Sequence, residues 1–201
     1  MGVYSIKPAF QRSLRPIEDV LVERGVHPDL ITLSALGISV TGGAALALSD
    51  RCPWLLLAAP AVALTRTALN ALDGLVAKRT GRARPWGEVL NEFSDRLADV
   101  ALLGGLALSA SADALLGAAA VVAVLLVSYL GILSKAAGGP RQYGGVMGKA
   151  DRMLLLSLAG PLALFTNPVV VINSFFAVIL VGSLATAAQR GVRTHADLQS
   201  S

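Results

Sequence analysis

Long apolar stretches separated by short polar segments run along the chain. Six of these stretches are predicted to be membrane-spanning helices, because a helix needs about 20 apolar residues to cross a bilayer. The third is polar in its first half, and the fifth is short and is expected to begin near Lys149. The expected spans are residues 30–48, 53–75, 89–110, 112–133, 152–165 and 168–187. We therefore predict an all-α integral membrane fold with six transmembrane helices.

The segment before the first span, residues 1–28, is polar and contains basic residues among isolated apolar ones at helical spacing. This pattern predicts an N-terminal amphipathic helix that lies on the membrane surface, although a solvated tail with a few apolar residues would look similar. It contains no apolar run of the signal-peptide type. The predicted domains are a juxtamembrane segment (1–28), a six-helix domain (29–190) and a cytoplasmic tail (191–201).

Composition supports the membrane assignment, and the distribution of basic residues predicts the orientation of the chain in the membrane. The chain is 54% hydrophobic and 15% charged, with a mean hydropathy of +0.65, whereas soluble domains are about a quarter charged. If the N-terminus is inside, all but three of the 17 Lys and Arg fall in inner segments. The positive-inside rule then predicts a multi-pass protein of the cell membrane with both termini in the cytoplasm. The net charge of +4 is attributed to this topology and to anionic lipid, and nucleic acid is not expected as a partner.

One stretch, residues 70–95, places polar and ionisable side chains at helical spacing in this apolar chain. Such residues at membrane depth are costly, and they indicate a functional site. These residues lie on one face of the second predicted span and on one face of the third. They are Arg66, Asn70, Asp73, Gly74 and Ala77 on the second, and Glu88, Asn91, Glu92, Asp95 and Asp99 on the third. The two helices are predicted to form an antiparallel hairpin whose polar faces meet near the cytoplasmic boundary.

Opposed carboxylate and amide oxygens are ligands that suit Mg²⁺, Mn²⁺ or Ca²⁺. Basic residues beside them, such as Lys78, would hold phosphates, so the stretch suggests a diphosphate substrate bridged by metal. A remaining carboxylate would act as general base toward a hydroxyl. A packed polar cluster that only fixes helix register is the alternative. For Glu88 and Glu92 that simpler explanation is favoured, because acids in a first turn suit the helix dipole.

The stretch resembles the signature of the CDP-alcohol phosphotransferases, D-x2-D-G-x2-A-R-x8-G-x3-D-x3-D. The chain reads N-x2-D-G-x2-A-K-x8-G-x3-N-x3-D from residue 70 to residue 95, and every interval matches. Lys78 keeps the charge of the family arginine, whereas Asn70 and Asn91 replace the first and third aspartates. Residues 25–32 also resemble the family's entry to the first span, and Gly148-Lys149-x2-Arg152 resembles its basic entry to the fifth helix.

The resemblance implies an enzyme of phospholipid biosynthesis. Such an enzyme transfers a phosphatidyl group from a CDP-linked donor, usually CDP-diacylglycerol, to an alcohol hydroxyl, releases CMP and uses Mg²⁺ or Mn²⁺. A homodimer is also implied. Carried over by position, Asp73 and Asp95 would bind metal together with Asn70 and Asn91, and Asp95 would also be catalytic. The implied CDP-binding residues are Gly74, Ala77, Lys78 and Gly87. An acceptor phosphate would be held by Arg141, Lys149 and Arg152, which are equally well explained as anchors of the positive-inside type.

The two asparagines leave the site with two fewer carboxylates than the family pattern. Asp99 or Glu88 would compensate in part. Three interpretations remain: an active phosphotransferase, a pseudoenzyme that binds a CDP-lipid or a partner enzyme without turnover, and a small multipass transporter or scaffold. The identity of the acceptor alcohol is not readable from the sequence.

Overall fold

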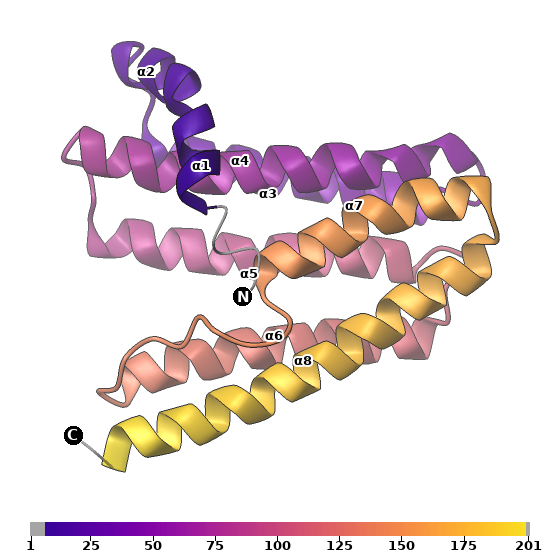
Figure 1. Cartoon of the computed structure of the whole chain (residues 1–201). Coiled ribbons are helices and arrows are strands. Elements are labelled where there is room, and N and C mark those ends of the chain that lie inside the picture. Colours follow the sequence, from indigo (N-terminus) through magenta and orange to yellow (C-terminus); the bar gives the residue numbers. More distant parts are fainter. Residues whose placement is uncertain (1–6, 200–201) are drawn as a thin grey trace.

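The computed structural model describes residues 7–199, and every regular element in that range is a helix (Figure 1). This confirms the predicted all-α class. The elements are α1 (Lys7–Ser13), α2 (Arg15–Glu23), α3 (Pro28–Ala47), the short 3₁₀ helix η2 (Pro53–Leu57), α4 (Ala58–Arg79), α5 (Pro85–Ala107), α6 (Ala114–Ala136), α7 (Lys149–Phe165) and α8 (Pro168–Gln199).

Six long helices pack side by side and carry their connections at two opposite ends. α3 lies against both α4 and α5, α7 packs on α4 and α8, and α6 packs on α5 and α8. In Figure 1 the α4–α5 and α6–α7 connections lie at the left-hand end together with α1, α2 and the end of α8. The segments predicted to face the cytoplasm are therefore gathered at one end of the bundle.

All six predicted spans correspond to helices, but only four of these helices are long and apolar enough to cross a membrane. The four segments are Pro28–Ala47, Pro53–Arg79, Ala114–Ala136 and Pro168–Gln199. α7 has only 17 residues, and α5 carries charged side chains in its first half. The last helix continues to Gln199, through most of the segment predicted as a tail. The structure thus supports a membrane protein with at least these four spanning helices.

The N-terminal segment contains two short helices where one amphipathic helix was expected. α1 and α2 are separated at Leu14, which is buried and belongs to a small apolar cluster with Leu72 and Val76 of α4. Arg79 at the end of α4 forms ion pairs with Glu18 and Asp19 of α2. The part of the prediction that covers residues 1–6 falls outside the described residues.

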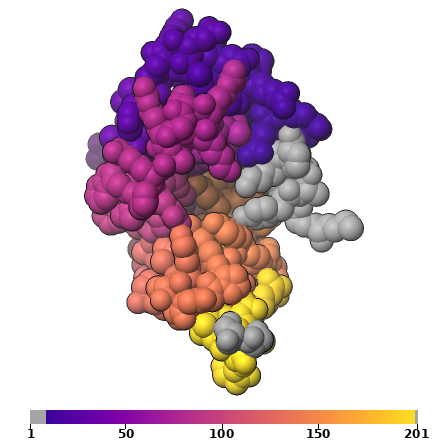
Figure 2. Space-filling view, turned by 90° about the vertical axis from the view of Figure 1, so that its left-hand side faces the viewer, coloured from indigo at the N-terminus to yellow at the C-terminus, as the bar shows by residue number. Residues whose placement is uncertain are grey.

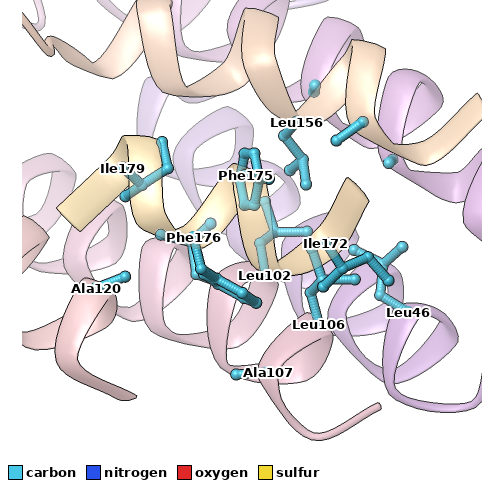
Figure 3. Packing of buried hydrophobic residues seen from close by; sticks show 14 of the residues in the cluster. Leu46, Leu102, Leu106, Ala107, Ala120, Leu156, Ile172, Phe175, Phe176 and Ile179 are labelled. Atoms are coloured by element: carbon cyan, nitrogen blue, oxygen red, sulfur yellow. The ribbon is translucent and has the colours of Figure 1, made fainter. Parts of the chain in front are cut away.

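The apolar core occupies the part of the bundle away from the polar hairpin. Its largest fully buried apolar side chains include Phe176 of α8, Leu46 of α3 and Leu102 of α5. Figure 3 shows Phe176 and its neighbour Phe175 among side chains of α5, α6 and α7. The polar faces of α4 and α5 therefore meet on one side of a dry core.

Two glycines allow the backbones of α3 and α5 to touch. A Cβ built on Gly105 would lie 2.1 Å from the carbonyl oxygen of Gly43, and one built on Gly43 would lie 2.0 Å from that of Ala101. Small residues at such crossings are typical of membrane helices, because they let the backbones approach closely. This contact fixes the position of α5, and with it the acidic residues of its first half.

We expect Gly105→Ala to destabilise the fold, because the added methyl group would overlap the backbone of α3. Overpacking of this kind costs about 1–3 kcal/mol. Gly104→Ala is the matched control, since a Cβ at Gly104 would meet nothing within 4 Å. Thermal unfolding in detergent measures both variants. Equal melting temperatures for the two would contradict the close crossing.

Candidate active site

The turn between α4 and α5 brings the two polar faces together. Gly81 has a φ of +66°, a conformation that glycine adopts without steric cost and that commonly ends a helix. The N–H of Arg82 donates to the carbonyl of Ala77 at 2.9 Å, and Pro85 starts α5, where its fixed φ suits a first helical turn. The hairpin that results places Asp73 of α4 opposite Asn91 of α5.

A cavity of about 840 Å³ opens beside this hairpin. Figure 2 looks onto the same end of the molecule and shows a recess between the α4–α5 segment, in magenta, and the α6–α7 segment, in orange. Most residues that the sequence placed at the site line the cavity: Asn70, Asp73, Gly74, Ala77, Lys78, Gly87, Glu88, Asn91, Glu92, Asp95, Arg141, Lys149 and Arg152. Arg66 and Asp99 do not line it and are fully buried.

Asp73 is buried and receives only neutral hydrogen-bond donors. Its Oδ2 accepts from the Thr32 hydroxyl at 2.9 Å and from the Asn91 amide at 2.5 Å. Its Oδ1 accepts from the backbone N–H of Gly74 at 2.6 Å. The carboxylate is held between α3, α4 and α5. Sequence reasoning did not assign a role to Thr32, although it lies in the segment that resembles the family entry to the first span.

Asp95 has a strongly cationic environment. Its Oδ1 accepts from the Lys149 ammonium at 2.5 Å and from the Asn70 amide at 3.0 Å. The guanidinium of Arg66 lies 3.7 Å from the same oxygen, and that of Arg96 lies 3.8 Å from Oδ2. Each asparagine of the stretch thus donates to the aspartate on the other helix of the hairpin, Asn91 to Asp73 and Asn70 to Asp95.

Asp99 is 1% exposed and sits between two equally buried arginines. Arg66 of α4 approaches it at 2.8 Å and Arg152 of α7 at 3.1 Å. Arg66 also donates to the backbone carbonyl of Asp95 at 3.0 Å. Asp99 therefore joins α4, α5 and α7 below the cavity floor, and its charge is already matched by protein side chains.

The mouth of the cavity is lined by ion pairs from the α6–α7 side. Glu88 bonds to Lys135 at 2.5 Å, and Glu92 bonds to Arg141. Glu88 is half exposed and turned toward Lys135, so its charge is directed to the rim of the cavity.

Arg190 of α8 was not anticipated from the sequence and holds the α6–α7 connection in place. It is buried, and its guanidinium donates to the carbonyls of Val127 at 2.7 Å, Gly144 at 3.0 Å and Tyr143 at 3.1 Å. Nothing in its local sequence distinguishes it from an ordinary basic residue near the end of a span. Its role depends on a loop that packs against it from another part of the chain.

Solved structures share this fold. The chain superposes with a TM-score of 0.77 on phosphatidylinositol phosphate synthase of Mycobacterium tuberculosis with CDP-DAG bound, at 24% identity, covering 91% of this chain and 94% of that one. A structure of the same enzyme in complex with manganese and citrate gives a TM-score of 0.75 at 24% identity, covering 89% of this chain and 87% of that one.

Relatives by sequence decide the family, although no family model matches the chain. The chain is 37% identical over 160 residues to the inner membrane protein YnbA of Escherichia coli K12, covering 80% of this chain and 79% of YnbA. It is 29% identical over 195 residues to phosphatidylinositol phosphate synthase of Streptomyces avermitilis, covering 91% of this chain and 78% of that enzyme. The chain belongs to the CDP-alcohol phosphotransferase family.

The CDP-alcohol phosphotransferase signature falls on the α4–α5 hairpin. Its two departures, Asn70 and Asn91, are the residues that link the two retained aspartates across the hairpin. Within residues 7–199, no three His, Cys, Asp or Glu side chains come together as a group that could hold a metal ion. Two carboxylates and two amides therefore make up the polar centre of this site.

We expect Asp99→Asn to destabilise the protein strongly, because it leaves the buried arginines Arg66 and Arg152 without their common counter-ion. Breaking a buried ion pair typically costs about 3–5 kcal/mol. Asp19→Asn serves as the control, since Asp19 and its partner Arg79 are both about half exposed and exposed pairs contribute about 0–1 kcal/mol. Thermal unfolding in detergent compares the two variants. Similar melting temperatures would contradict the structural role of Asp99.

Proposed function

We propose that this protein transfers a phosphatidyl or other substituted phosphate group from a CDP-linked lipid, such as CDP-diacylglycerol, to an alcohol. The alcohol oxygen attacks the lipid-side phosphorus, the bond from this phosphorus to the bridging diphosphate oxygen breaks, and CMP leaves with that oxygen. The observation that carries the proposal is the single cavity in which Asp73 and Asp95 lie with the family's spacing beside a basic rim. Membership of the CDP-alcohol phosphotransferase family supports it.

The residues of the cavity fit one divalent cation, Mg²⁺ or Mn²⁺. Asp73 carries a negative charge that no basic side chain of the described residues pairs with. The amides of Asn70 and Asn91 donate through nitrogen, which leaves their oxygens available. Hard oxygen donors of this kind suit either ion. When bound, the ion supplies positive charge to the phosphate oxygens. A fold neighbour is described in complex with manganese.

The nucleotide is proposed to lie along α4 and the start of α5. A Cβ at Gly74 would meet nothing within 4 Å, and one at Gly87 would meet only Arg84, at 3.7 Å. This bare wall, with Ala77, leaves room for a flat base and ribose. Lys78 is exposed and forms no ion pair with another residue of the described range, so its ammonium is available for the diphosphate.

Asp95 is proposed to take the proton of the attacking hydroxyl. Its side chain is 13% exposed, it lines the cavity, and the Lys149 and Asn70 contacts fix its orientation. Arg141, Lys149 and Arg152 line the wall that comes from the α6–α7 side. We propose that this wall faces the acceptor, where it would favour an alcohol that carries phosphate. Relatives named as phosphatidylinositol phosphate synthases are consistent with such an acceptor.

We also propose that α5 and α7 span the membrane with the other four helices, since each packs between two of them. The positive-inside rule places the cavity and both termini on the cytoplasmic side, with α1 and α2 as the segment at the membrane surface. The predicted homodimer stays a prediction.

The transfer reaction is tested with purified protein, CDP-diacylglycerol, Mn²⁺ and a panel of alcohols that includes inositol phosphate, glycerol phosphate and serine. We expect CMP release with at least one alcohol. Asp95→Asn should lower kcat by about 10²–10⁴-fold, the usual contribution of a general base. Asp50→Asn, at the opposite end of the bundle, is the control. Binding of CDP-diacylglycerol without CMP release from any alcohol would indicate the pseudoenzyme instead.

We expect Gly74→Leu to block nucleotide binding while the protein remains folded. An added Cβ would meet nothing within 4 Å, and the rest of the new side chain is expected to enter the cavity, so the melting temperature should stay within a few degrees. The affinity for CDP-diacylglycerol, measured by calorimetry, should fall at least tenfold. The matched control is Gly37→Leu, because Gly37 also has nothing within 4 Å of an added Cβ but does not line the cavity. Unchanged affinity in Gly74→Leu would place the nucleotide elsewhere.

A further inference from the structure

The two carboxylates of the site differ in their counter-charges. Asp95 has one ammonium in direct contact, from Lys149, and two guanidinium groups within 4 Å, from Arg66 and Arg96. Asp73 forms no ion pair with any residue from 7 to 199, and its partners are a hydroxyl, a backbone N–H and an amide. Asp73 is nevertheless 5% exposed. One buried carboxylate is thus compensated by the protein and the other is not.

This difference determines which carboxylate binds a divalent cation more favourably. A buried carboxylate without a counter-ion is unfavourable, so a cation placed beside Asp73 relieves that cost. A second cation beside Asp95 would have to displace the Lys149 ammonium and would also meet the positive charges of Arg66 and Arg96. Because like charges repel strongly where water is scarce, the surroundings of Asp95 oppose a divalent ion.

Contacts at the start of α7 hold the backbone of Lys149 in place. It is the first residue of α7, and Gly148 before it donates its N–H to Asp151 at 2.9 Å. Met147 donates its N–H to the Thr186 hydroxyl of α8 at 2.8 Å. One turn further along α7, Arg152 is anchored by Asp99. The ammonium of Lys149 is therefore directed at Asp95 by the packing of α7 on both of its sides.

We propose that the site takes a single divalent cation, on Asp73 with the neighbouring asparagine amides, and that the Lys149 ammonium occupies the place of a second cation at Asp95. This inference rests on the proposed function for its use of a divalent ion. It explains why the site tolerates amides at positions 70 and 91. One divalent ion and one ammonium need fewer negative charges around them than two divalent ions do.

The test is a titration of Mn²⁺ into purified protein without nucleotide or lipid substrate, followed by electron paramagnetic resonance and calorimetry. The wild type should bind one Mn²⁺ per chain. Asp73→Asn should weaken this binding at least tenfold, whereas Asp95→Asn should change it less than threefold. Lys149→Met should allow a second Mn²⁺ to bind, and Lys149→Arg should keep the count at one. Lys135→Met, which removes a lysine paired with Glu88 at the rim, is the control and should also bind one ion.

Two bound ions in the wild type would overturn the inference. So would equal loss of Mn²⁺ binding in Asp73→Asn and Asp95→Asn, or a count of one that persists in Lys149→Met while its melting temperature shows it to be folded. CMP release, measured on the same preparations, separates this inference from the proposed function. A protein that binds one Mn²⁺ in this pattern but releases no CMP contradicts the function alone, and one that releases CMP with two ions contradicts the inference alone.

Discussion

The buried ion cluster of Asp99 with Arg66 and Arg152 is the contact on which the rest of the site depends. It ties α4, α5 and α7 together at a depth where an unpaired charge would be very unfavourable. Because Asp99 pairs with an arginine from each of two neighbouring helices, the cluster fixes the relative register of the three helices. Arg66 also donates to the backbone carbonyl of Asp95, and this hydrogen bond links the cluster to the cavity. Ion pairs therefore hold together the helices at the floor of the cavity. The same helices form its walls, so these pairs also set the positions of the walls.

One end of the bundle holds the polar cavity and the other holds the apolar core. The two ends contribute differently to the structure. Close backbone contact at Gly43 and Gly105, together with the buried apolar side chains around Phe176, supplies packing there without charged side chains. Side chains on α4, α5 and α7 then project into the cavity from this packed frame. A phosphotransfer site benefits from such placement, because catalysis of this kind relies on positioning and on charges that are already in place.

Sequence patterns predicted much of this organisation. The apolar runs predicted six helices in the correct order, including the start of α7 at Lys149. All eight signature positions line the cavity. The polar first half of α5 and the short length of α7 were also visible in the sequence. The partners of individual side chains were not. The place of Asp99 below the floor and the turn of Glu88 toward Lys135 depended on which neighbours α4, α6 and α7 supply.

Local periodicity and motif spacing determined the fold class, the hairpin and the identity of the polar residues, because these depend only on intervals along one or two adjacent helices. Tertiary structure alone decided how the charges are shared. Lys149, Arg152 and Arg190 come from helices far along the chain. The sequence suggested an acceptor phosphate as the partner of Lys149 and Arg152, and Arg190 looks like an ordinary basic residue at a span end. Packing sends Lys149 to Asp95 and leaves Asp73 without a cation, and no interval in the sequence records that difference.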